Sequence, residues 1–168
     1  MKYRYLDHTS DLGMEIFGRG LPDLFVNACY AMFDNILDLS TVSAAESRRV
    51  ELRSATRDEL FLDWLRELLF RFATDYFVVK EVTKIELARG QGSGGGEQGG
   101  PDDCRLQNTE CRMQNGERGS WSLVAEVKGE KFDPARHRVK IEIKTPTYHM
   151  FSITEDASGC KATVIFDV

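Results

Sequence analysis

The segment from residue 56 to residue 72 constrains the fold more than any other part of the chain. It opens with Thr56-Arg57-Asp58-Glu59, a capping box in which the threonine and glutamate side chains bond the free N–H groups of a helix start. Apolar side chains then recur every three or four residues, in a stripe made by Leu60, Phe61, Trp64, Leu65, Leu68, Leu69 and Phe72. We therefore predict a long helix, and we interpret its stripe as core packing rather than a cofactor site.

A second helix is predicted from about residue 22 to about residue 36. Pro22 suits the first turn of a helix, because N–H groups at that position form no hydrogen bond within the helix. Apolar side chains follow at helical spacing, at Leu24, Phe25, Ala28, Ala31 and Met32. Asp34 and Asp38 lie near the helix end, where acids oppose the helix dipole. They are either surface charges or groups that face a cation or a basic partner.

Strands are predicted at both ends of the chain and after each helix. Alternating or β-branched and aromatic residues mark them at 3–6, 14–18, 50–52, 77–79, 82–87, 121–127, 139–144, 150–154 and 162–166. The alternation at 139–144 predicts a strand with one face in water. Because the helices do not alternate regularly with the strands, we expect an α+β fold. It would be a single domain over residues 1–168, with a mixed or antiparallel sheet of about seven strands packed with two long helices.

Residues 90–119 differ in composition from the rest of the chain. They are rich in Gly, Gln, Asn and Asp and poor in apolar side chains, so they cannot offset the entropy of becoming ordered. We expect a flexible Gly-rich insertion between two strands. Gly90, Gly92 and Gly95 form a literal G-x-G-x-x-G, but a dinucleotide site needs these glycines between a strand and a helix. We interpret the match as accidental.

Charge and hydropathy narrow the classes of partner. The chain has 22 basic and 27 acidic residues, a net charge of −5, whereas proteins that grip RNA directly usually carry a basic face. The balance favours a protein partner or a cation. No run approaches the roughly 20 apolar residues of a membrane span, and residues 1–4 lead straight into a patterned segment without a secretory leader. We expect a cytoplasmic protein without membrane contact.

The cysteines fit a reducing compartment. Cys29, Cys104, Cys111 and Cys160 form no C-x-x-C pair, so free thiols are the simplest interpretation. A zinc or redox pair between Cys104 and Cys111 is the less favoured alternative, because their spacing matches no zinc-site pattern.

Acidic groups stand at two places that the fold could bring together. Asp7 and Asp11 flank His8 in a polar turn between the first two predicted strands, and Asp167 with the carboxylate of Val168 follows the last strand. If that strand lies beside the N-terminal hairpin, Asp11 meets Asp167 and Val168. Clustered oxygens without a thiolate suit a hard cation, Ca²⁺ or Mg²⁺. In the simpler alternative, an aspartate caps the turn and Asp167 is solvated.

Sequence motifs of catalysis are scarce. The chain contains no G-x-x-x-x-G-K-[ST], no G-x-S-x-G and no H-E-x-x-H. Each histidine, at positions 8, 137 and 149, is most simply a packed or surface side chain. A hydrolase that uses Asp7, His8 and Asp11 remains as an alternative to a protein that is not an enzyme.

Several of these segments resemble the archease family. Residues 5–13, YLDHTSDLG, are similar to its opening D-H-T-[AS]-D-x-G motif, and both predicted helices resemble its helices. Glu142-Ile143-Lys144, Tyr148-His149 and the closing VIFDV of residues 164–168 are similar to its C-terminal block. Thr145-Pro146 and Cys160 depart from the residues common in the family, which affects local packing more than the acidic groups.

The resemblance implies an accessory protein rather than an enzyme. Archeases assist an RtcB-type RNA ligase in tRNA splicing and RNA repair, promoting its guanylylation and its multiple turnover, so RNA would be reached through the ligase. They also carry a divalent cation, usually calcium. Carried over residue by residue, the metal ligands would be Asp11, Asp167 and the main chain of Val168. A general protein chaperone is the alternative function for the family.

Overall fold

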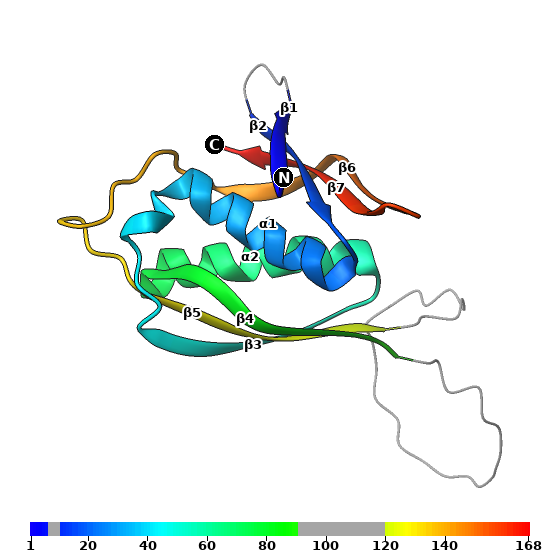
Figure 1. The fold of residues 1–168 in the computed structure, drawn as a ribbon, viewed down its shortest axis with the longest axis horizontal. Helices are drawn as coiled ribbons and strands as arrows, with labels where there is room; N and C mark the ends of the chain where they lie inside the picture. Colours follow the sequence, from blue (N-terminus) through cyan, green and yellow to red (C-terminus); the bar gives the residue numbers. More distant parts are fainter. Residues whose placement is uncertain (7–10, 91–119) are drawn as a thin grey trace, which may run out of the picture.

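Two helices lie between two antiparallel sheets in the computed structural model, which describes residues 1–6, 11–90 and 120–168 (Figure 1). The terminal sheet has the strand order β1-β2-β7-β6, and the central sheet has the order β3-β5-β4. The elements are β1 (Tyr3–Leu6), β2 (Leu12–Gly18), α1 (Leu21–Ile36), the short 3-10 helix η1 (Leu39–Thr41), β3 (Glu46–Ser54), α2 (Arg57–Asp75), β4 (Phe77–Arg89), β5 (Trp121–Lys131), β6 (Thr145–Asp156) and β7 (Gly159–Asp167).

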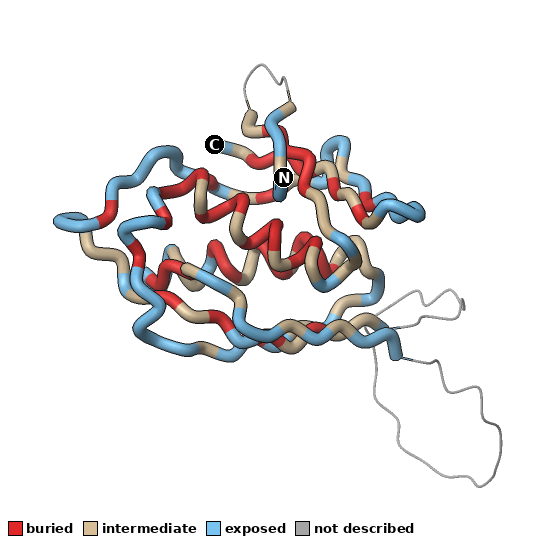
Figure 2. Tube along the Cα trace, viewed as in Figure 1, coloured by how far each residue is buried: buried red, intermediate tan, exposed pale blue. Residues whose placement is uncertain are grey.

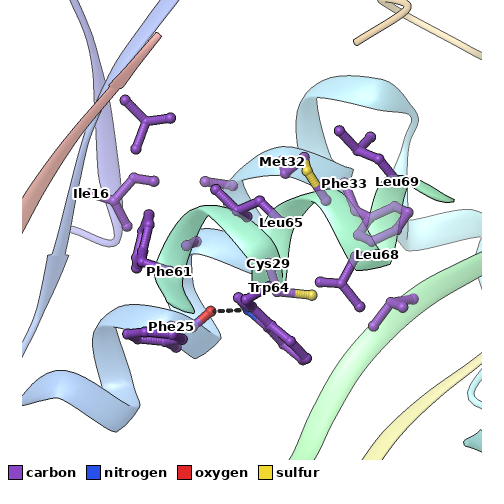
Figure 3. Close-up of a cluster of buried hydrophobic side chains, with 14 of the residues drawn as sticks. Ile16, Phe25, Cys29, Met32, Phe33, Phe61, Trp64, Leu65, Leu68 and Leu69 are labelled. Carbon is purple, nitrogen blue, oxygen red and sulfur yellow. Dashed lines mark hydrogen bonds between the residues drawn. The ribbon is translucent and has the colours of Figure 1, made fainter. Parts of the chain in front are cut away.

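The core fills the space between the sheets, around the two helices (Figure 2). The predicted stripe of α2 is buried except at its end, and α1 buries side chains on most of its circumference because both sheets pack on it. Trp64 joins the helices: its indole Nε1–H donates to the Phe25 carbonyl over 3.0 Å (Figure 3). The rings of Phe25 and Phe61 meet edge to face, with centroids 4.9 Å apart.

The predicted α+β fold with about seven strands and two long helices is confirmed, and all strand pairs are antiparallel. The strands form two sheets rather than one. The capping box is present: the Thr56 hydroxyl accepts from the Glu59 N–H, and the Glu59 carboxylate accepts from the Thr56 N–H. No helix in the part of the chain that the structure describes is both long and apolar enough to cross a membrane.

The prediction of a strand over residues 139–144 is wrong. The segment makes one isolated bridge to the residue after α1, and the Lys140 N–H donates to the Ile36 carbonyl over 2.7 Å. It therefore crosses the end of α1 in an extended form, without a strand ladder beside it. Its alternation marks a buried side chain only at Ile143, since Val139 and Ile141 remain 47% and 36% exposed.

Cys29 and Cys160 are free and buried, in agreement with the prediction of unpaired thiols for these two. Burial raises the pKa of the Cys29 thiol well above its usual range, so this side chain behaves as a small apolar group in the core. Cys104 and Cys111, and the Gly-rich residues 91–119, lie outside the described residues.

Candidate functional site

The candidate site lies where β2 begins and β7 ends. These strands pair antiparallel over seven positions, and the last pair joins Leu12 to Phe166. Asp11 directly precedes Leu12 and Asp167 directly follows Phe166, so the two aspartates flank the last pair of this antiparallel ladder. The last strand therefore lies beside the N-terminal hairpin, which is the arrangement that the proposed cation site requires (Figure 1).

Strand alternation gives both aspartates the same face. Phe166 is fully buried toward the helices, so its neighbour Asp167 belongs to the outer face of the terminal sheet. Leu12 is the partner of Phe166, and Asp11 correspondingly belongs to the outer face with Asp167. Two partly exposed aspartates thus flank the same end of the β2–β7 ladder, which we call the acidic corner.

Lys144 holds the end of β7 from the other side. Its main-chain N–H donates to the Asp167 carbonyl over 2.8 Å, and its ammonium Nζ donates to the Val168 carbonyl over 3.1 Å. The next residue, Thr145, is the register partner of Asp167 in β6. No sequence pattern indicates a role for Lys144, because this contact exists only once β6 and β7 are paired.

The end of α1 supports the hairpin that carries Asp11. The Tyr3 hydroxyl donates to Asp34 Oδ2 over 2.7 Å, and the Tyr5 hydroxyl donates to Asn35 Oδ1 over 2.9 Å. Burial, with Asp34 beside it, raises the pKa of the Tyr3 hydroxyl well above its usual range. Lys140 Nζ lies 3.8 Å from the Asp34 carboxylate. Asp34 therefore faces a basic residue of its own chain.

Asp38 has a structural role. Its carboxylate accepts a hydrogen bond from the Ser40 N–H over 2.9 Å at the start of η1. Bonds from Ser40 lower the pKa of this carboxyl group, so Asp38 acts as a cap.

The residues present fit a hard cation bound through oxygen. The corner offers two carboxylates, from Asp11 and Asp167, and the main-chain oxygen of Val168, with no thiolate in this donor set. Ca²⁺ takes about six to eight oxygen ligands, so these groups supply part of a coordination shell. In residues 1–6, 11–90 and 120–168, no group of three or more His, Cys, Asp or Glu side chains is placed to hold a metal.

The two described histidines lie in different surroundings. His137 is buried, its Nδ1 accepts from the Asp133 N–H over 2.9 Å, and its Nε2 lies 3.1 Å from Glu130 Oε1. Both ring nitrogens therefore serve the structure. His149 is exposed on β6. Asp7 and His8, which the hydrolase alternative requires, lie outside the described residues.

The chain is similar to known proteins over nearly its whole length. The model of the Archease protein family (MTH1598/TM1083) matches residues 3–168. A Protein archease of Methanosarcina barkeri is 34% identical over 167 residues, covering 99% of this chain and 96% of that protein. A Protein archease of Archaeoglobus fulgidus is 28% identical over the full length of both.

A solved structure shows the same architecture. The solution structure of Methanobacterium thermoautotrophicum protein 1598 is 29% identical and superposes with a TM-score of 0.69 over 99% of each chain. The family model spans nearly all of the sequence, including both strands that form the acidic corner. The chain therefore belongs to the archease family.

Proposed function

We propose that this chain is a metal-binding activator of an RtcB-type RNA ligase. It promotes guanylylation of the ligase and its multiple turnover in tRNA splicing or RNA repair, and it performs no catalysis of its own. Its place is the cytoplasm, with the ligase. Membership of the archease family supports the function, and the pairing of β2 with β7, whose last pair is flanked by Asp11 and Asp167, is the observation that supports the site.

The proposed cation is Ca²⁺, with Mg²⁺ as the second choice, and its ligands are Asp11, Asp167 and the main-chain oxygen of Val168. Like charges directly opposite each other destabilise a pair of strands. A divalent cation between the two carboxylates removes that repulsion and fixes the corner. Lys144, whose ammonium group donates to the main-chain oxygen of Val168, already holds the end of β7 beside the proposed ligands.

A cation at this corner suits contact with a protein partner. Val168 is 38% exposed, and the described donors leave coordination positions over for other ligands. A partner residue can complete the shell, so that the cation seats part of the ligase against this chain. The net charge of −5 supports a role in which the ligase, rather than this chain, binds the RNA.

The function is tested by ligation under multiple-turnover conditions, with excess RNA and the cognate RtcB-type ligase. We expect the chain to raise both the number of joined RNAs per ligase and the rate at which the ligase becomes guanylylated. A ligase that is shown to be active but does not respond to the chain in either assay contradicts the proposal.

A general chaperone is the second candidate, favoured by exposed aromatic side chains. Phe70 and Tyr76 are each 62% exposed at the outer side of α2. A chaperone would suppress the aggregation of unrelated proteins and would not need Asp167. Light scattering of a heated client protein, with wild type and Asp167→Ala compared, separates the two functions.

A further inference from the structure

A groove runs along α2 on the side that neither sheet covers. We define the α2 groove as the hollow of about 610 Å³ between the second half of α2 and the segment 142–145. Its walls include the aromatic rings of Phe70, Phe72, Tyr76 and Phe132. A smaller hollow of about 300 Å³ shares Arg66 and Phe70 with it and extends toward β3.

Phe70 is an aromatic residue on the outward face of α2, outside the apolar stripe. It is 62% exposed, whereas the apolar stripe of α2 points into the core. Tyr76, at the end of α2, is equally exposed. Large apolar side chains that gather at a hollow mark surfaces for binding, and aromatic residues and arginine dominate the energetics of such surfaces.

The two cations that line the groove, Arg66 and Lys144, are engaged within the chain. The Arg66 guanidinium lies 3.3 Å from Asp63 and stacks over the ring of Tyr148, 5.2 Å from its centroid. The Lys144 ammonium donates to the Val168 carbonyl. Glu142 adds a negative charge to the wall. A phosphate backbone would need cations that are free to meet it, so the groove suits an uncharged apolar segment of a protein better than RNA.

The groove is continuous with the acidic corner. Lys144 forms part of the groove wall and also bonds to the end of β7 through both its main-chain N–H and its ammonium group. A partner that completes a cation site at Asp167 is therefore held beside the mouth of the groove. The volume lies within the range of about 300–1,000 Å³ that is usual for binding sites, which leaves room for several apolar side chains.

We propose that the α2 groove binds an uncharged apolar segment of the ligase that this chain activates. The inference rests on the proposed function and adds a second contact to it. The cation site positions the partner, and the aromatic walls of the groove supply binding energy by burying apolar surface on both proteins. Phe70 is the central contact, because it is exposed and borders both hollows.

The test compares affinities of full-length variants for the cognate ligase by biolayer interferometry in the presence of Ca²⁺. Phe70→Ser removes the aromatic contact, and Ala73→Trp fills the groove. Val139→Ser is the matched control, because Val139 is 47% exposed and does not line the groove. We expect both groove variants to weaken ligase binding at least about tenfold, as the loss of a central interface residue does. The control should bind like wild type.

Two further measurements make the outcomes distinct. Ca²⁺ titration of Phe70→Ser should match wild type, since the residue is not a ligand of the proposed site.

If wild type stimulates ligation but both groove variants bind the ligase like wild type, the groove inference is overturned while the proposed function stands. If Phe70→Ser weakens binding of a single-stranded RNA to the chain alone and leaves ligase affinity unchanged, the groove is an RNA surface and the inference is also overturned. If wild type neither binds nor stimulates an active ligase, the proposed function fails and the inference falls with it.

Discussion

Glu130 illustrates how one carboxylate can join segments that lie far apart in the chain. It accepts hydrogen bonds from the Ser43 N–H over 2.6 Å and from two guanidinium nitrogens of Arg136, each over 3.0 Å. His137 Nδ1 accepts from the Asp133 N–H, so its Nε2 carries the proton and donates to Glu130. The bonds from Arg136, Ser43 and His137 lower the pKa of Glu130 to about 2.

This lowered pKa predicts a pH dependence of stability. In the unfolded chain Glu130 takes up a proton near its ordinary pKa of 4.5, while in the folded chain it resists protonation down to about 2. Its contribution is therefore complete above about pH 4.5 and is lost as the pH falls toward 2. We expect Glu130→Gln to unfold at lower urea concentration at neutral pH and to lose less stability than wild type between pH 4.5 and 2. Equal pH slopes for the two proteins would show that Glu130 is not linked to folding in this way.

The two facing aspartates predict the behaviour of the cation site. Removing a ligand should cost at least as much affinity as the roughly 10–100-fold that follows loss of an outer-shell partner. We therefore expect Asp11→Asn and Asp167→Asn each to weaken Ca²⁺ binding at least tenfold in calorimetric titrations. Glu81→Gln, which changes an exposed carboxylate on β4, is the control and should bind like wild type. Unchanged binding in both aspartate variants would remove these residues from the site.

The acidic residues of the site could be proposed from the sequence, but their surroundings could not. Asp11 and Asp167 stand beside segments with clear strand patterns, so a pairing of those strands was enough to bring them together. Lys144 lies in a segment whose alternation suggested a strand, and nothing local indicated that its ammonium reaches the Val168 carbonyl. Contacts between residues in different elements depend on register, which single-sequence patterns do not determine.

Among the elements, the helices were the most predictable. Both α1 and α2 follow the apolar periodicity closely, and the start of α2 is determined by a local capping box. The segment 139–144 was mispredicted because alternation alone does not supply a neighbouring strand. Its main chain instead bonds to the end of α1. A helix forms its main-chain hydrogen bonds within the element, whereas a strand needs hydrogen-bond partners from elsewhere in the chain.

The capping box makes a prediction for α2 as a whole. Thr56→Ala removes the side chain that accepts from the Glu59 N–H, which should lower the free energy of unfolding by about 1 kcal/mol. Thr74→Ala makes the same substitution at an exposed position in the last turns of the helix and should change it by less than about 0.5 kcal/mol. Urea denaturation measures both. Equal losses would mean that the cap does not stabilise the start of α2.

At the scale of the whole molecule, the fold brings both ends of the chain into one sheet, whereas the strands that flank the Gly-rich insertion belong to the other sheet. β1, β2 and β7 lie side by side in the terminal sheet, while residues 91–119 join β4 to β5 in the central sheet (Figure 1). The base of that connection is closed, since Arg89 pairs with Trp121 and the Gly90 N–H donates to the Ser120 carbonyl over 2.6 Å.

This arrangement predicts that the insertion is dispensable for folding. Replacing residues 91–119 by Asn-Gly leaves Gly90 and Ser120 facing each other across a two-residue hairpin turn, a connection that antiparallel strands favour. We expect the shortened protein to melt within a few degrees of the full chain and to stimulate the ligase equally. A large loss of thermal stability would assign the insertion a place in the folded domain.

The most direct test of the central claim is multiple-turnover RNA ligation by the cognate RtcB-type ligase with wild type, Asp167→Ala and the control Glu81→Ala. Circular dichroism first establishes that all three proteins are folded. We expect wild type and Glu81→Ala to raise the number of joined RNAs per ligase and Asp167→Ala not to raise it. Full stimulation by folded Asp167→Ala would contradict this expectation, because activation would then proceed without the carboxylate pair at the ends of β2 and β7.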